Sequence, residues 1–499
     1  MDNYFVSSCK RVKDWICRQF GQKEKKTVHH KKLADGGEVI VWETGRAGEE
    51  AASYENLFLR KEIAGFRTNI RREQSCSIKS LTRDYLYKQL LSSGEYTFDH
   101  MLVIKDPYGE APLTALALFI LEEPARVRVT TKGNLKETDF VTELPKKKEH
   151  RVPILGMYAE KANDIVIEIL DDEGNCVKSH TFTIRTKRLP KSLRNVITVK
   201  KWTDKPAYSN IMINGGVKIH TCVFDIEGKI RYYLSRKPRG YGIFPLSDGH
   251  FFYMEKYISV PSYSNPQTVE SYDMDYFGRV FRTYLTEKGV HHTAEEKAGG
   301  NILTGSNSML EHTEDCVIEI DRQTGEIVWQ LNMAEIFDET YQNMMDWCHV
   351  NSAAYYEKDR TILISLRNVH AVICVDYDTK KLRWILSDPK FWEGTKMTPY
   401  LLQPEGDVKW CYQQHAAFEI ALPDESNPQK KRIIVYDNHW AKRRKAKSFD
   451  KDPLSYVSFY DIDEEKKTVS LHKRFAGPKT RIRANGIYVP DKKRVYNMA

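Results

Sequence analysis

The sequence predicts a mainly β protein in which a six-bladed β-propeller follows a small β-sandwich domain and a helical N-terminal segment. Three observations predict this fold. Helical patterns are confined to the first part of the chain, and short strand patterns fill it from about residue 97 onward. After about residue 200, two kinds of hairpin alternate, and their first copies recur at about 50 residues. We therefore expect three regions, residues 1–95, 96–195 and 196–499.

The N-terminal region is basic and partly helical. In residues 1–30, several apolar side chains fall near one helical face. They are Phe5, Val12, Trp15, Ile16 and Phe20. Such a segment can lie on a membrane, but we expect it to pack onto the body of the protein or onto a partner subunit. Residues 50–92 carry mixed charge with few turn breakers and predict further helix.

The middle region consists of short strand patterns. Alternating or β-branched runs follow one another there, bounded by Asp-Pro, Lys-Gly and Glu-Gly turns. The runs are ALALFIL, ARVRVTT, DIVIEIL and HTFTIRT. Several short strands at this spacing predict a small antiparallel sandwich.

The third region is an internal repeat of two hairpin elements. The first element is an Asp, a tight turn and a strand that ends in an aromatic residue, at 224–234, 274–285, 319–331, 375–386 and, more weakly, 460–475. The second is a polar turn leading into another strand, with the copies LSDGHFFYM, KAGGNILTG, EKDRTILIS, QKKRIIVYD and PDKKRVYNM. Four strands per unit at a period of about 40–50 residues are typical of a propeller blade. Five such pairs are present, and the sixth blade is not complete in this sequence.

Equivalent strands of different blades are expected to bring polar residues toward one axis. The segments that lead into the second hairpins are GVHHTAEEKAGGNIL, HVNSAAYYEKDRTIL, QQHAAFEIALPDESNPQKKRIIV and RIRANGIYVPDKKRV. Because equivalent positions of a propeller face one central pocket, we expect the polar side chains of these segments and of the strand after Asn351 to gather there. They are His292, His349, Asn351, Arg367, His415 and, from the last copy, Arg483 or Asn485. His250 and His370 lie in or near hairpin strands and are expected to be structural.

A pocket with three histidines allows two kinds of chemistry. The histidines could hold a metal ion in a hydrolase or lyase, but we find no carboxylate at a matching level, and Arg367 would repel a cation. Imidazoles with Arg and Asn suit the transfer of a phosphoryl or sulfuryl group, because fixed donors stabilise charge that spreads over three oxygens. One neutral imidazole can attack as a nucleophile while another protonates the departing oxygen. A non-catalytic propeller that serves as an interaction platform is a further alternative.

The order of the motifs resembles a known family. The motifs DWCHVNS (346–352), SLR (365–367) and CYQQHAA (411–417) follow one another as in the bacterial arylsulfate sulfotransferases, and the HH of GVHHT (289–293) fits as well. DPYGEAPLTALALFI and HRVPILGMYAEKANDIVIEI look like the small N-terminal β domain of that family. The resemblance implies a six-bladed propeller that moves sulfuryl groups between phenols without an adenylyl-sulfate donor.

The resemblance also implies roles for individual residues. His415 would match the nucleophile that becomes sulfated in a ping-pong cycle, and His292, His349, Asn351 and Arg367 would hold the sulfuryl oxygens or handle the phenolic proton. The implied partners are aryl sulfates and phenols, with no metal or other cofactor.

Other positions of the expected site remain open. The family uses a hydroxyl-bearing residue from the last blade, whereas RIRANGIY offers Arg483 and Asn485 but no Ser or Thr. Three aromatic residues, Trp347, Trp410 and Tyr412, either line a phenol pocket or pack between blades. His439 in DNHW has no role assigned from the sequence.

Composition narrows the partners and the compartment. The net charge of +9 is dispersed apart from short runs at 146–148 and 442–447, so we do not expect a nucleic-acid-binding stripe. The 9 cysteines form no CxxC motif, and no apolar run is long enough for a signal peptide core or a membrane span. We expect a cytoplasmic protein and leave a homodimer open.

Overall fold

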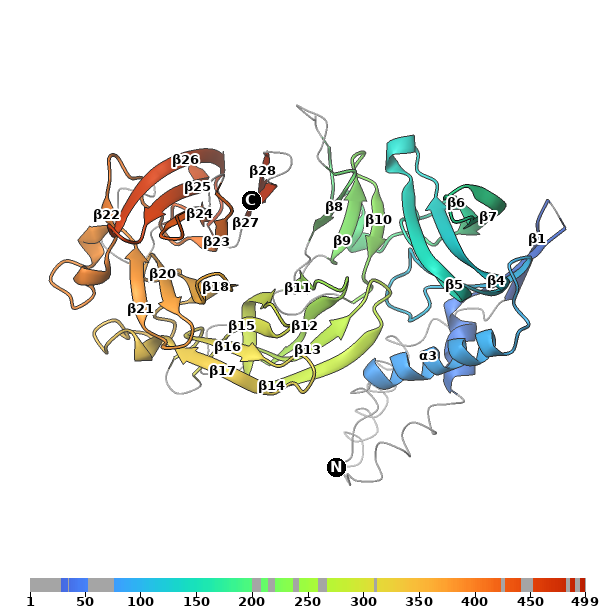
Figure 1. Ribbon diagram of the computed structural model, residues 1–499, viewed down its shortest axis with the longest axis horizontal. Coiled ribbons are helices and arrows are strands. Elements are labelled where there is room, and N and C mark those ends of the chain that lie inside the picture. The colour runs from blue at the N-terminus through green and yellow to red at the C-terminus, as the bar shows by residue number, and fades with distance from the viewer. Residues whose placement is uncertain are drawn as a thin grey trace, which may run out of the picture. The chain divides into compact units, whose positions relative to one another are not determined.

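The structure is a computed structural model, and it is mainly β as predicted (Figure 1). The chain divides into two compact units, Met1–Lys237 with Met274–Arg282, and Pro238–Asp273 with Thr283–Ala499. Among the described residues, no helix is both long and apolar enough to cross a membrane. The structure describes residues 28–498 apart from 35, 53–75, 200–207, 214–219, 237–241, 259–266, 309–311, 423–426, 441–451, 482–484 and 490–493.

The first unit contains a seven-stranded sheet in the order β1-β2-β3-β4-β6-β7, with β5 paired to β4. Its strands are β1 (Val28–Lys32), β2 (Glu38–Trp42), β3 (His100–Lys105), β4 (Ala115–Thr131), β5 (Phe140–Ile154), β6 (Ala162–Leu170) and β7 (Cys176–Arg185). The predicted runs are strands, but ALALFIL and ARVRVTT are the two halves of a single strand, β4. Strand β3 pairs with the first half of β4 and β6 pairs with the second half. The register with β5 shifts between these halves, where a bulge lets one long strand serve two sets of partners.

The N-terminal segment differs from the prediction at its described end. Residues 28–30, which were expected to belong to a basic tail after a short helix, are part of β1, and β1 pairs antiparallel with β2. Strand β2 in turn pairs parallel with β3, so its apolar side chains are buried in the core of the unit. Pairing of β2 with the distant β3 therefore extends the sheet to the N-terminal hairpin of β1 and β2. The apolar helical face expected from Phe5 to Phe20 lies outside the described residues.

The helical prediction for residues 50–92 holds for its last part. Helix α3 spans Cys76–Ser92, and residues 44–52 are also helical, whereas 53–75 lie outside the described residues. Leu86, Tyr87 and Leu91 of α3 pack with buried leucines of β3 and β4. The helix therefore covers one face of the sheet.

The first sheet of the predicted repeat belongs to the first unit. It consists of β8 (Asn210–Ile213), β9 (Cys222–Asp225) and β10 (Ile230–Tyr233). Arg231 is 1% exposed and donates hydrogen bonds to the carbonyl oxygens of Gly156 and Thr138, each at 2.7 Å. Its ion pair with Asp225 supplies the opposite charge that a buried guanidinium needs.

The remaining sheets carry the other hairpins of the repeat. Strands β11–β17 form one seven-stranded sheet, β18–β21 a four-stranded sheet, β22–β26 a five-stranded sheet and β27–β28 a two-stranded sheet. Their bounds are β11 (Gly242–Pro245), β12 (Phe251–Ile258), β13 (Gln267–Met274), β14 (Val280–Glu296), β15 (Ile302–Ser306), β16 (Cys316–Ile320), β17 (Ile327–Asn332), β18 (Val350–Tyr356), β19 (Thr361–Leu366), β20 (Ala371–Asp376), β21 (Leu382–Leu386), β22 (Gln403–Pro404), β23 (His415–Ile420), β24 (Lys430–Asp437), β25 (Leu454–Asp463), β26 (Thr468–Pro478), β27 (Asn485–Val489) and β28 (Arg494–Met498).

Both kinds of predicted hairpin are confirmed. The Asp-turn hairpins join β9 to β10, β13 to β14, β16 to β17, β20 to β21 and β25 to β26. The other kind joins β11 to β12, β14 to β15, β18 to β19, β23 to β24 and β27 to β28. Strand β14 takes part in two hairpins and so joins two repeats into one sheet. A complete ring of six blades remains a prediction.

The first strands of successive sheets lie beside one another in the second unit. Strand β18 contacts β15 and β23, and β27 contacts β23 and β24. This is the neighbour relationship that the repeat predicts for strands near a common axis. It places the starts of β18 and β23, and the bulged part of β14, close together.

Candidate active site

The candidate site lies where three equivalent strands carry the same irregularity. The pairing register shifts between His291 and Ala294 in β14, between Val350 and Ser352 in β18, and between His415 and Phe418 in β23. Each shift is a β-bulge, a feature that often lies next to active sites because it redirects a side chain. The three histidine-bearing segments are therefore equivalent in backbone geometry as well as in sequence.

Positive φ angles accompany these bulges. The φ angle is 58° at His292, 56° at His349 and 51° at Ala416, and it is 55° at Glu314 in the turn before β16. A residue other than glycine in this region costs on the order of 1–3 kcal/mol and persists only where the surroundings hold it. Residues that form the site are thus among those with a strained backbone.

The structure brings the three predicted histidines together. The ring centroids of His292 and His349 lie 4.8 Å apart. His415 interacts electrostatically with both rings, and Arg367 interacts with His415. The adjacent His291 has a different role, because its Nε2 donates a hydrogen bond of 2.8 Å to the Ser306 carbonyl oxygen. Of the HH pair, His292 belongs to the cluster and His291 is anchored to β15.

His415 is held as a neutral imidazole with a defined tautomer. Its Nδ1 lies 2.6 Å from Oδ1 of Asn438, whose Nδ2 donates to the Thr480 carbonyl oxygen at 3.2 Å. Since this second bond orients the amide, Oδ1 faces the ring and accepts a hydrogen bond from Nδ1–H. Burial lowers the pKa of His415 to about 3, with Arg367 contributing in the same direction. The Nε2 lone pair is therefore left for reaction.

His349 is held in the opposite protonation state. Its Nδ1 lies 2.6 Å from Oε2 of Glu314 and 2.9 Å from Oδ2 of Asp346. Burial opposes a charge on the ring, but the carboxylates of Glu314 and Asp346 outweigh burial and raise the pKa of His349 to about 9. His349 is consequently an imidazolium at neutral pH, with Nδ1 occupied and Nε2–H remaining as a donor.

Burial instead lowers the pKa of His292 well below its usual value, although Glu314 acts in the other direction. One site thus holds two neutral histidines and one charged histidine. Environments that separate pKa values in this way identify the base and the acid of a site.

Arg367 and Asn351 lie at the junction of β18 and β23. The backbone N–H of Arg367 donates to the His349 carbonyl oxygen at 3.1 Å, and its Nη2 donates to Oε1 of Gln413 at 3.0 Å. Nδ2 of Asn351 donates to the Gln414 carbonyl oxygen at 2.8 Å. These contacts hold both side chains against Gln413 and Gln414, the two residues that precede His415.

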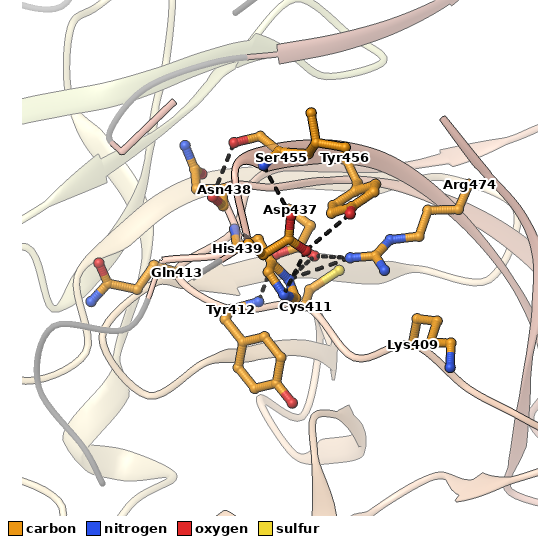
Figure 2. A network of polar contacts seen from close by, with 12 residues as sticks. Lys409, Cys411, Tyr412, Gln413, Asp437, Asn438, His439, Ser455, Tyr456 and Arg474 are labelled. Atoms are coloured by element: carbon orange, nitrogen blue, oxygen red, sulfur yellow. Dashed lines mark hydrogen bonds and ion pairs between the residues drawn. The ribbon is translucent and has the colours of Figure 1, made fainter. Parts of the chain in front are cut away.

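A buried network holds the other side of this segment, as Figure 2 shows. Asp437 is fully buried and accepts hydrogen bonds from the backbone N–H groups of Tyr412 and His439, each at 2.8 Å, and from Arg474 at 2.7 Å. Nδ1 of His439 lies 2.9 Å from the same carboxylate. Because Asn438 lies between two residues of this network, the network sets where its amide meets His415. His439 therefore belongs to the support of the site.

The predicted aromatic residues pack in the protein interior. Trp347 is 1% exposed and lies edge-on to Phe337, with ring centroids 5.8 Å apart. Tyr412 is 4% exposed and donates to the Asp388 carboxylate at 2.7 Å, and Trp410 packs against a hydrophobic cluster of β20, β24 and β25. Packing, the second of the two alternatives, accounts for their contacts.

The contribution of the last repeat to the site remains a prediction. Asn485 begins β27, which contacts β23 and β24, whereas Arg483 lies outside the described residues. His370 is structural as expected, because its Nδ1 accepts the backbone N–H of Gln413 at 3.0 Å. His250 likewise pairs with the buried Asp273, at 2.6 Å from its carboxylate.

Two residues that set the charges of the site were not predicted from the sequence. The expectation that no carboxylate lies at a matching level is wrong, since Glu314 is fully buried between His292 and His349. Glu314 precedes β16 and not a first strand of a repeat, so the alignment of first strands could not reveal it. Asn438 was overlooked beside His439 in DNHW, and only the folded chain shows that its amide meets His415.

Among the described residues, the group suited to hold a metal ion consists of His292, Glu314 and His349. Their ligand atoms lie within 4.8 Å of one another. A metal would require His349 to lose the proton that two carboxylates stabilise. The geometry therefore allows a cation, while the charges of the site favour a protonated His349.

The fold and the site define a mainly β protein with a buried cluster of three histidines and an arginine. The chain belongs to the arylsulfotransferase (ASST) family, whose model matches residues 195–496, and the arylsulfotransferase Ig-like domain matches residues 102–187. It is 22% identical to the arylsulfate sulfotransferase AssT of Lelliottia amnigena, covering 74% of this chain and 78% of the relative. Identity and coverage are the same for AssT of Escherichia coli O6:H1 (strain CFT073). An auxiliary nutrient binding protein from Bacteroides thetaiotaomicron aligns with a TM-score of 0.36 and 12% identity over 77% of this chain and 91% of that one.

Proposed function

We propose that this protein is an arylsulfate sulfotransferase that works by a ping-pong mechanism through a sulfated His415. The single observation that carries the proposal is the contrast between two histidines of one buried site. His415 is neutral with Nε2 left for reaction, and His349 is an imidazolium with a proton to donate. Family membership supports an aryl sulfate as the donor.

In the first half of the reaction, the Nε2 lone pair of His415 attacks sulfur. The N–S bond forms while the bond from sulfur to the phenolic oxygen breaks, and this oxygen keeps the electron pair. His349 transfers its Nε2 proton to the departing oxygen, so a neutral phenol leaves. Arg367 and Asn351 hold the sulfuryl oxygens, because fixed donors stabilise the charge that the transition state spreads over them.

The second half reverses these steps with an acceptor phenol. The acceptor gives its proton to His349 and its oxygen attacks sulfur, and the electron pair of the N–S bond returns to His415. Asn438 assists here, because Nδ1–H stays on the sulfated ring and leaves the ring positively charged. The cationic sulfated ring releases a neutral imidazole, which is a better leaving group than the imidazolate anion that a ring without this proton would release, and this favours transfer to the acceptor.

Trapping the intermediate tests this proposal. Rapidly quenched enzyme mixed with 4-nitrophenyl sulfate should gain about 80 Da, the mass of one sulfuryl group, at His415. His415→Gln should show no adduct, and adding a phenol to the sulfated wild type should remove it as the aryl sulfate of the acceptor appears. Active enzyme that never shows the adduct would exclude the covalent mechanism.

A metal-dependent hydrolase is the second candidate, and the cluster of His292, Glu314 and His349 is the observation that favours it. It would require a metal at a one-to-one ratio that tracks activity, and water in place of a phenol as the acceptor. Metal content and product analysis on the same samples separate the two candidates.

A further inference from the structure

Glu314 is attached to the strand of His349 through its backbone as well as its side chain. Its carbonyl oxygen accepts the N–H of Val350 at 2.7 Å, and its own N–H donates to Oδ1 of Asn307 at 2.8 Å. The side chain is fully buried, and the φ angle of 55° is one that few residues adopt. The carboxylate is therefore held rigidly beside His349, the residue before Val350.

The Glu314 carboxylate spans two histidines from different strands. Its Oε2 lies 2.6 Å from Nδ1 of His349, and its Oε1 lies 3.9 Å from Nδ1 of His292. A fully buried carboxylate is costly unless a positive charge compensates it. Because Nδ1 of His349 is the nearer partner and also faces Asp346, the compensating proton resides on His349.

We infer that Glu314 is a positioning residue that keeps His349 protonated, so that His349 can serve as the proton donor to the departing phenolate. This inference rests on the proposed function. It adds Glu314 to that mechanism. It also explains why a carboxylate is buried among groups that bind an anionic substrate. Glu314 acts through His349 and does not itself contact the sulfuryl group.

The other groups around His349 oppose its charge, with one exception. The three histidines disfavour one another's protonated forms, so His292 and His415 do not stabilise the charge of His349. Arg367 adds a fixed positive charge near His415. Burial also disfavours the imidazolium. Only Asp346 assists Glu314 among the described residues, and Asp346 is 14% exposed whereas Glu314 is fully buried. Low exposure strengthens an electrostatic interaction, so Glu314 contributes more of the stabilisation.

This role predicts a dependence on the leaving group. The 4-nitrophenolate ion leaves readily without a proton, whereas unsubstituted phenolate needs one. Loss of the proton donor therefore slows transfer from phenyl sulfate more than transfer from 4-nitrophenyl sulfate. A role confined to folding would slow both donors by the same factor.

The test compares Glu314→Gln with the wild type, and uses Glu314→Asp as the variant that keeps the charge. We expect E314Q to lose on the order of 10²-fold in kcat with phenyl sulfate, and much less with 4-nitrophenyl sulfate. The alkaline limb of its pH profile should move to lower pH, because activity falls as pH rises through the pKa of His349. E314D should keep a profile close to that of the wild type.

A second measurement does not depend on activity. Histidine-labelled protein is titrated by NMR, with the His349 signal assigned by its absence from His349→Gln. In E314Q, His349 should titrate about one to three pH units lower than in the wild type. If the wild type forms no adduct, the proposed function fails while this titration still decides the role of Glu314.

Two results would overturn the inference. An unchanged titration of His349 in E314Q, or an equal loss with both donors, would leave Glu314 as a folding residue. Stoichiometric metal in the wild type that is lost in E314Q would make Glu314 a metal ligand.

Discussion

Nδ1 of His415 lies 2.6 Å from Oδ1 of Asn438, and this contact determines which nitrogen of the ring can react. The same amide donates its Nδ2–H to the Thr480 carbonyl oxygen, so it cannot turn over without losing two hydrogen bonds. An anchored amide of this kind selects one imidazole tautomer without adding a charge.

Asn438→Asp should move the acid limb of activity to higher pH. His415 attacks only when it is unprotonated, and its pKa of about 3 keeps it so over most of the pH range. A carboxylate in place of the amide would stabilise the imidazolium and raise that pKa, so activity would be lost earlier as pH falls. A pH profile of kcat/KM measures the effect, and Asn332→Asp, at a half-buried 3₁₀-helix cap outside the site, is the matched control. An acid limb that stays in place would show that Asn438 does not govern His415.

Arg367→Lys should reduce turnover on the order of 10²–10³-fold while the thermal midpoint changes little. A guanidinium presents a planar set of donors to a tetrahedral anion, whereas an ammonium is a point charge. Steady-state kinetics and thermal unfolding of the same preparation measure both quantities. Unchanged turnover would remove Arg367 from the sulfuryl-binding groups, and a collapse of the midpoint together with activity would make Arg367 structural.

Prolonged EDTA treatment should leave activity intact. Nδ1 of His349 already contacts two carboxylates and carries a proton that a metal would have to displace. Activity and metal content are measured before and after dialysis, with the buffer alone as the control. Activity that disappears with the metal and returns with added zinc would favour the hydrolase alternative.

Gly305→Ala should destabilise the fold and impair the site together. A Cβ at this position would lie 2.6 Å from Cε1 and 3.0 Å from the carbonyl oxygen of His291, which would displace the ring next to His292. Overpacking of this kind costs about 1–3 kcal/mol in the free energy of unfolding. Gly48→Ala is the control, since its Cβ would meet only the flexible end of Arg83 at 3.2 Å. Equal unfolding midpoints for the two variants would contradict this account of Gly305.

Local patterns in the sequence predicted most of the strands, the hairpins and the histidines and arginine of the site. Alternating apolar residues and turn residues act over a few neighbours, so they predicted hairpins such as β18–β19 and β23–β24. Repeat equivalence then placed His292, His349 and His415 together, because identical local structure puts equivalent residues in equivalent places.

Only the tertiary structure decided the charges of these histidines. Glu314 and Asn438 come from turns outside the aligned strands, and their distances to His349 and His415 depend on how separate sheets pack. The strand β1 shows the same limit, since residues 28–30 were expected to be part of a basic tail and instead pair with β2. Residue types and spacing therefore predict which groups meet, whereas burial and long-range contacts decide which of them carries the proton.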